Sequence, residues 1–199
     1  MGVTGIQVVP FQPVVQAIKW AVEEGCKLEI VGTVRPDCEY TDIDLLDELG
    51  ASVMLLHGAI TDKLNWNFIG DRLDAIKDKG SIPGLVTHAP FRTTLELLKS
   101  SILDLFDIYM LPVNKLGYLM DTQEFLDKER SRFRELIKGL NKKIIAKKIL
   151  AAGILKPEEA FDYLKALDYV DIVALGIASE AEAQETFQLL AMKSQNKQL

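Results

Sequence analysis

Residues 52–57, SVMLLH, and residues 82–88, IPGLVTH, enclose the stretch 65–79, NWNFIGDRLDAIKDK. The two flanking runs are short and apolar on both faces, which is typical of parallel strands covered by helices. The stretch between them has a helical pattern and ends just before Gly80, where a helix C-terminal glycine belongs. Strand, helix and strand therefore form one β-α-β unit, and the rest of the chain repeats this unit.

The same alternation extends along the whole sequence. We expect strands over 5–10, 28–34, 52–57, 82–88, 107–114, 143–150 and 170–176. We expect helices over 13–24, 42–49, 65–79, 92–98, 122–140, 157–167 and 180–193. Seven consecutive βα units favour an α/β fold of the (β/α)8 TIM-barrel type over an open Rossmann sheet. The first turn, VPFQPV, also lacks the glycines that a dinucleotide-binding sheet carries there.

The number of strands leaves three arrangements open. A closed barrel needs an eighth strand and about 250 residues, whereas this chain has 199 residues. Either the first βα unit is absent, or the barrel has seven strands, or the sheet is open. In each case we expect residues 1–199 to form a single barrel-like domain, because no linker or break in composition divides them.

Composition excludes several classes of protein. With 48% hydrophobic and 26% charged residues the chain is neither disordered nor collagen-like. No apolar run approaches the roughly 18 residues of a membrane span, and no basic flank marks a signal peptide. The net charge of −6 argues against nucleic acid as a partner. Two cysteines suit a reducing compartment. We expect a cytoplasmic protein with a small-molecule partner, and leave homo-oligomer formation open.

Both histidines of the chain fall at the C-terminal ends of expected strands, where the active sites of TIM barrels lie. His57 ends the third strand and His88 ends the fourth. We interpret them as acid-base or ligand residues that face the barrel mouth and lie close together. The alternative is that both are held at the rim by local backbone bonds. Asn114, at the end of the fifth strand, is a further candidate catalytic residue.

The sixth strand carries two lysines in an apolar run, IIAKKIL. Side chains alternate along a strand, so one lysine points into the barrel and the other towards the helices. Lys148 shares a face with Ala146, a small residue suited to a crowded barrel axis, and we therefore expect Lys148 to point inward. Burial there lowers the pKa of an amine and suits it to act as a base, an anchor or a Schiff-base nucleophile. The alternative is that both lysines reach solvent.

Two turns of small residues follow the last strands and can hold an anion or cofactor. They are AAGIL at 151–155 and GIAS at 176–179, with Gly153, Gly176 and Ser179 as the candidate binding residues. Glu180 and Glu182 count against a strongly anionic ligand at the second turn, and ordinary tight turns explain both equally well. We expect no resident metal, and we leave the identity of any cofactor open.

Several segments in combination carry a family resemblance over roughly residues 50–190. They are HGAITD (57–62), DRLDAIKDKGSIPGLVTHAP (71–90), DIYMLPVN (107–114), AKKILAAGIL (146–155) and VDIVALGIASEAEAQET (170–186). The chain resembles the aldo-keto reductase-like TIM-barrel proteins, particularly an uncharacterised bacterial and archaeal branch. In that family a Tyr, an Asp, a Lys and a His form the catalytic tetrad, and His57 matches the His. The segment GIQVVPFQPV (5–14) stands where the family has its Asp and Tyr, and Thr33 and Val34 stand at the Lys.

Four functions follow from these observations. The first is a non-reductase barrel enzyme of lyase or aldolase type, in which Lys148, His57 and His88 act on a small polar or phosphorylated metabolite. The second is a degenerate NADP-dependent oxidoreductase, with the two small-residue turns holding the cofactor. The third is a non-catalytic pseudoenzyme or binding protein. The fourth, which we rank last, is a divalent-metal hydrolase that uses His57, His88 and Asp62.

Overall fold

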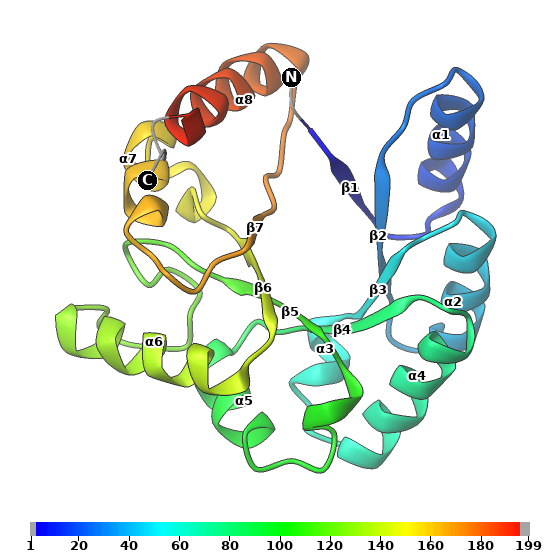
Figure 1. The fold of residues 1–199 in the computed structure, drawn as a ribbon, viewed down its shortest axis with the longest axis horizontal. Coiled ribbons are helices and arrows are strands. Elements are labelled where there is room, and N and C mark those ends of the chain that lie inside the picture. The colour runs from blue at the N-terminus through cyan, green and yellow to red at the C-terminus, as the bar shows by residue number, and fades with distance from the viewer. Residues whose placement is uncertain (1–2, 196–199) are drawn as a thin grey trace.

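One sheet of seven parallel strands forms the centre of the molecule (Figure 1). The structure, a computed structural model, describes residues 3–195. Each strand is hydrogen-bonded to the next in chain order. The strands are β1 (Gly5–Val8), β2 (Glu29–Val34), β3 (Val53–Leu56), β4 (Ile82–Val86), β5 (Ile108–Pro112), β6 (Lys143–Lys147) and β7 (Ile172–Val173). The expected α/β fold with parallel βα units in chain order is confirmed.

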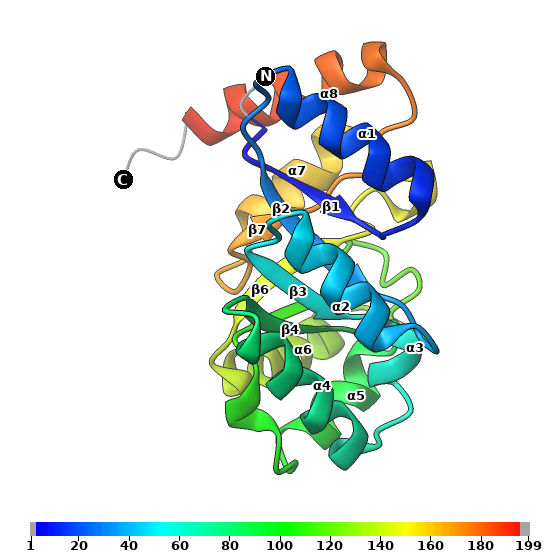
Figure 2. The same cartoon turned by 90° about the vertical axis from the view of Figure 1, so that its right-hand side faces the viewer.

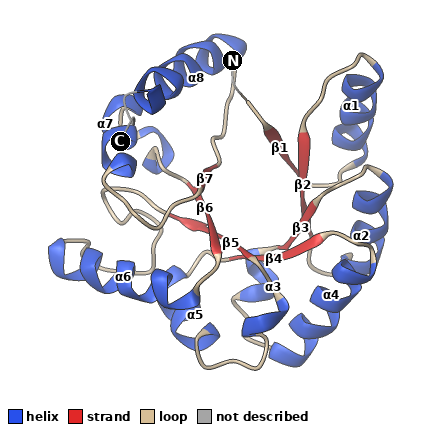
Figure 3. Ribbon diagram, viewed as in Figure 1, coloured by secondary structure: helices blue, strands red, loops and turns tan. Residues whose placement is uncertain are grey.

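Helices lie on the outer side of the curled sheet (Figure 3). They are α1 (Gln12–Glu23), α2 (Glu39–Glu48), α3 (Gly58–Thr61), α4 (Trp66–Asp78), α5 (Pro90–Leu97), α6 (Asp127–Leu140), α7 (Pro157–Lys165) and α8 (Glu180–Gln195). Seen from the side, α1, α2 and α4 lie next to one another along the outside (Figure 2). Within residues 3–195, no helix is both long enough and apolar enough to span a membrane.

The sheet buries both of its faces, which explains why its strands are apolar throughout. A large cluster lies between the strands and the helices and includes Met54 and Leu56 of β3. A small cluster lines the inner, concave face and consists of Val53, Leu55, Val86, Ile108, Met110 and Ile145. Alternate residues of one strand therefore belong to different clusters, as the pleat requires. This division shows which side of each strand faces inward.

The sheet curls without closing. β1 and β7 are its two edge strands, and within the described residues no hydrogen bond joins them. β7 has only two residues instead of the expected 170–176, since only Ile172 and Val173 find partners on β6. Ile172 is 50% exposed. Of the three arrangements left open by the sequence, the described residues form the open one, an incomplete barrel.

The segment after β5 differs from the expected helix over 122–140, because α6 begins only at Asp127. Residues 115–126 instead form a loop that places Met120 and Phe125 in the core. Thr122, whose hydroxyl donates to the carbonyl of Glu124, lies in this loop. The buried loop side chains fix a compact path that a continued helix does not allow.

The register of β6 corrects the expectation for Lys148. Ala146 packs in the outer cluster under the helices, whereas Ile145 belongs to the inner cluster. Lys147 has the same parity as Ile145 and pairs with Pro112 of β5, so Lys147 is the lysine on the inner face. Lys148 lies just beyond the strand, with a left-handed backbone (φ +56°). The expectation that Lys148 shares the inner face with Ala146 was wrong by one residue.

Candidate functional site

The two histidines meet at the C-terminal ends of β3 and β4. Their ring centroids are 5.3 Å apart, with the rings at 63° to each other. They come together because each follows directly, or within two residues, the end of one of two neighbouring parallel strands. The expected proximity of His57 and His88 is confirmed, and their catalytic role remains a prediction.

His57 has a defined tautomer. It is the N-cap residue of α3, and its Nδ1 accepts a hydrogen bond from the backbone N–H of Ala59 at 3.1 Å. Because Nδ1 is an acceptor, the proton of the neutral ring lies on Nε2. Burial lowers the pKa of His57, and the charge of Lys147 lowers it further. His57 therefore offers a neutral N–H donor at Nε2.

The environment of His88 strongly disfavours the charged form of its imidazole. Burial lowers its pKa to about 4, and the charges of Lys147 and Lys148 add to this effect. The Asp62 carboxylate opposes the shift, but its Oδ2 is 3.9 Å from His88 Nδ1, which is beyond hydrogen-bond distance. At neutral pH the mouth thus holds two uncharged imidazoles.

Asp62 organises the loop that carries His88. Its Oδ1 accepts the hydroxyls of Thr87 and Thr93, and its Oδ2 accepts the backbone N–H of His88 at 2.9 Å. Both carboxylate oxygens are therefore occupied by the protein itself. Among the described residues, no group of three or more His, Cys, Asp or Glu side chains is arranged to hold a metal ion. Asp62 acts here as an anchor that joins the end of α3 to the start of α5.

Gly58 makes the close packing of His88 possible. A Cβ atom at this position would lie 2.4 Å from His88 Nδ1 and 2.7 Å from Cε1, far inside van der Waals contact. The His88 ring thus packs directly over the first residue of α3. The glycine of the segment HGAITD is explained by this contact.

Lys147 is the third group of the site. It is half-buried at the end of β6, and burial lowers the pKa of its amine to about 8, with a further decrease caused by Lys148. Its charge lowers the pKa values of both histidines, which places it near the pair. Within the described residues its ammonium has no hydrogen bond or ion pair. The strand places an amine that is partly neutral at physiological pH beside two neutral imidazoles.

Asn114 has a structural task. Its Oδ1 accepts the backbone N–H groups of Leu116 and Tyr118, and its Nδ2 donates to the carbonyl of Tyr118 at 2.9 Å. The side chain is almost fully buried and fixes the start of the loop after β5. These contacts account for Asn114 without chemistry, and its predicted catalytic role has no support in them.

The three predicted cofactor-binding residues lie apart from the histidine pair in sequence and show no contact with it. Ser179 is the N-cap of α8, since its Oγ accepts the N–H of Glu182 at 3.2 Å. The Glu182 carboxylate in turn accepts the N–H of Ala178, so the helix's own acid occupies the place of an anion. Gly153 forms a tight turn (φ +85°), and a Cβ atom added at Gly176 would meet nothing within 4 Å. Their role in cofactor binding remains a prediction.

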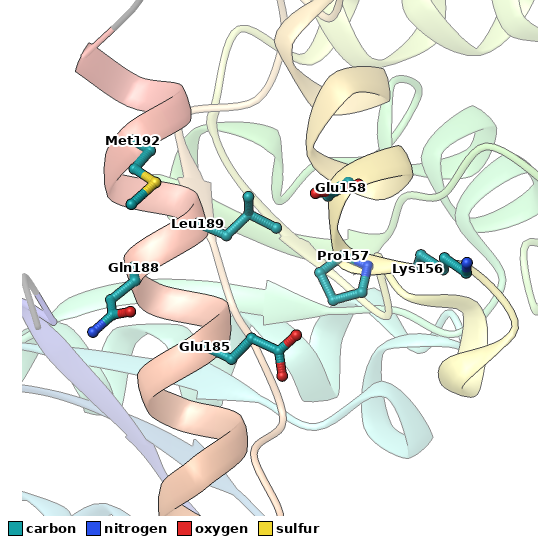
Figure 4. A pocket seen from close by; sticks show the side chains of 7 residues that line it. All are labelled: Lys156, Pro157, Glu158, Glu185, Gln188, Leu189 and Met192. Atoms are coloured by element: carbon teal, nitrogen blue, oxygen red, sulfur yellow. The ribbon is translucent and has the colours of Figure 1, made fainter.

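A groove of about 490 Å³ lies in the outer layer between α7 and α8 (Figure 4). It is lined by Lys156, Pro157, Glu158, Glu185, Gln188, Leu189 and Met192. None of these side chains belongs to the strand ends, and the groove holds no histidine or thiol. We therefore place the candidate site at the strand ends and not in this groove.

Two further residues shape the mouth: Thr33, which stands where the family resemblance places the lysine, and Asp121, which the sequence did not single out. Thr33 lies on the inner face of β2, where its hydroxyl accepts a hydrogen bond from Gln7 at 2.9 Å. Asp121, in the loop after β5, accepts the N–H groups of Phe91 and Arg92 at the start of α5. Burial raises the pKa of Asp121, and these bonds oppose the rise. Asp121 lies 30 and 29 residues from Phe91 and Arg92, so no local sequence pattern indicates these two contacts.

The fold is similar to that of two solved structures from Pseudomonas aeruginosa, each described as a putative aldo-keto reductase. Both superpose with a TM-score of 0.70 at 18% sequence identity and cover 97% of this chain, which spans 76% and 78% of theirs. No protein-family model matches the sequence, and no curated protein does. The chain therefore has an aldo-keto reductase-like fold. At this identity the likeness concerns the fold alone.

Proposed function

We propose that this protein is a lyase of aldolase type that acts on a small carbonyl metabolite through an imine at Lys147. One observation carries the proposal: an unpaired, half-buried amine with a pKa of about 8 lies at a strand end beside two neutral histidines. An amine is nucleophilic only when deprotonated, and desolvation in a protein is a known means to that end. The role that the sequence suggested for Lys148 passes to Lys147.

The first step forms the imine. The neutral Lys147 amine attacks the substrate carbonyl carbon, a C–N bond forms, and the oxygen becomes an alkoxide that takes up a proton. His57, with its N–H at Nε2, donates a hydrogen bond to this oxygen and stabilises the charge that develops there. Loss of the oxygen as water leaves the protonated imine on Lys147.

The second step breaks a carbon–carbon bond. The β-hydroxyl of the substrate loses its proton to the neutral His88, and the electron pair of the C–C bond moves to the imine nitrogen. The first carbonyl product leaves, and the enamine carbon takes back a proton. Water then hydrolyses the imine, which releases the second carbonyl product and regenerates Lys147. The water consumed equals the water released in the first step, so no further reactant is needed.

An NADP-dependent oxidoreductase is the second candidate function. It is favoured by the aldo-keto reductase-like fold, with His57 at the strand end where the family resemblance places the tetrad histidine. A shared fold does not establish which reaction a protein catalyses. We also infer a cytoplasmic location, because Cys26 and Cys38 are both free and exposed, which suits a reducing compartment.

Borohydride trapping tests the proposal. The protein is incubated with a panel of small aldehydes and ketones and sodium borohydride, and adducts are mapped by mass spectrometry. We expect reduced adducts at Lys147 that disappear in Lys147→Met and persist in Lys115→Met, whose native ammonium is paired with Glu159. Equal labelling of Lys115, or no adduct, would contradict the imine. NADPH oxidation with the same panel would favour the oxidoreductase.

A further inference from the structure

Unpaired positive charge gathers at the mouth of a protein whose net charge is −6. Two other cations near the strand ends have carboxylate partners: Arg35 pairs with the buried Asp42 at 2.7 Å, and Lys115 pairs with Glu159. Within residues 3–195, Lys147 and Lys148 have no such partner. Two neighbouring amines without a counter-ion point to a ligand that carries the negative charge.

The nearest carboxylate does not fill this role. Both oxygens of Asp62 already accept hydrogen bonds from Thr87, Thr93 and the backbone of His88. Its charge acts on Lys147 from a distance but forms no ion pair with it. The two imidazoles are neutral and do not compensate the charges of the two lysines. The charges that act on Lys147 are therefore those of Lys148 and of Asp62, whose oxygens already accept hydrogen bonds.

Lys148 lies just beyond β6, directly after Lys147. Its left-handed backbone (φ +56°) breaks the alternation of β6, so it need not point away from its neighbour. Its charge lowers the pKa values of both Lys147 and His88, which shows that it lies near both groups. The Cα atoms of consecutive residues are about 3.8 Å apart. The two lysine side chains thus start from adjacent backbone positions.

We propose that the substrate is a 2-oxo acid, whose carboxylate is held by Lys148 while its carbonyl carbon meets Lys147. This assignment rests on the function proposed above. A 2-oxo acid has its carboxylate directly bonded to the reacting carbon, which matches neighbouring amines on one turn. A phosphate several bonds from the carbonyl has no comparable reason to sit beside the imine-forming residue. Lys148 is in this view a residue that determines substrate specificity.

Oxalate binding tests the anion site without any covalent chemistry. Oxalate, a dianion that forms no imine, is titrated calorimetrically into the wild-type protein. We expect Lys148→Met to weaken binding about tenfold and Lys115→Met to leave it unchanged. Bound oxalate should also raise the pKa of His88, measured by NMR, because it offsets the lysine charges. Equal affinity of wild type and Lys148→Met, or tighter binding of inorganic phosphate than of oxalate, would overturn the proposal.

Trapping with matched ketones separates this inference from the proposed function. Pyruvate and acetone are both methyl ketones, and only pyruvate carries a carboxylate. We expect borohydride to trap pyruvate on Lys147 at least tenfold faster than acetone, and Lys148→Met to abolish this preference. If neither ketone is trapped but oxalate binding still depends on Lys148, the imine is wrong and the anion site stands. If both ketones are trapped equally and oxalate binding ignores Lys148, the imine stands and the 2-oxo acid assignment is wrong.

Discussion

Replacement of Lys147 by methionine should make the protein more stable. Burial lowers the pKa of this amine from 10.5 to about 8. Each pKa unit corresponds to about 1.36 kcal/mol, so the charged form costs the folded state at most about 3.4 kcal/mol. Solvent at the mouth screens part of this cost. Methionine has a similar length and no charge, and we expect Lys147→Met to raise the free energy of unfolding by about 1–2 kcal/mol at pH 7.

The gain should depend on pH with a defined sign. Below pH 8 the amine is protonated in both the folded and the unfolded state, and the folded state carries the full cost. Between pH 8 and pH 10.5 the folded state releases its proton first, so the wild-type protein gains stability relative to the variant. Above pH 10.5 both states are neutral and the electrostatic difference vanishes. The advantage of Lys147→Met should therefore be complete at pH 7 and largely lost at pH 10.5.

Urea unfolding of both proteins at pH 7 and pH 10.5 measures this difference. Lys115→Met is the matched control, because the Lys115 ammonium is exposed and paired with Glu159 at 2.5 Å. We expect this control to change the free energy of unfolding by less than about 0.5 kcal/mol. A Lys147→Met protein that is no more stable than wild type at pH 7, or one with the same gain at both pH values, refutes the argument from burial.

Three further changes test the rest of the site. Asp62→Asn places an amide donor opposite the Thr93 hydroxyl and the backbone N–H of His88, and should lower the free energy of unfolding, measured in urea, by about 2–3 kcal/mol. Asp71→Asn, at an exposed position, should leave this free energy almost unchanged. Gly58→Ala should displace the His88 ring and raise its pKa from about 4 towards 6.5 in an NMR titration. Gly70→Ala should leave this pKa unchanged, because the nearest atom to the added Cβ, Leu105 Cδ1, lies at an ordinary contact distance of 3.5 Å. The free energy of unfolding of the wild type should fall as pH decreases from 6.5 to 4, because the unfolded state binds the His88 proton first. His88→Gln should reduce this fall by about 1 kcal/mol, a value that allows for the 42% exposure of the His88 side chain.

The order of the elements could be predicted because each βα unit is encoded locally. A buried parallel strand is an apolar run, and its helix is an amphipathic stretch, so both patterns lie within about 30 residues. The meeting of His57 and His88 followed from the same logic, since neighbouring parallel strands end at one edge of the sheet. Strand lengths could not be predicted in the same way: β7 is shorter than its apolar run, because pairing depends on the partner strand and not on composition.

The register of β6 could not be predicted from its own residues. A strand that is apolar on both faces gives no alternation, so the run IIAKKIL does not say which lysine faces inward. The answer lies in the pairing of Lys147 with Pro112 and in the packing of Ala146 under the helices. The contacts of Asp62 escaped prediction for a similar reason. Its partners Thr87 and Thr93 are 25 and 31 residues away and share no motif with it.

The fold alone gives no reason for an amine at position 147. A half-buried ammonium without a partner lowers the stability of the folded state, and a methionine in its place would pack on the inner face without this cost. Lys115 and Lys143 differ in this respect, since each reaches a carboxylate. A perturbed amine beside groups with lowered pKa values is instead typical of a functional site. The stability lost at Lys147 and the chemistry proposed for it thus have one cause, the removal of an amine from water.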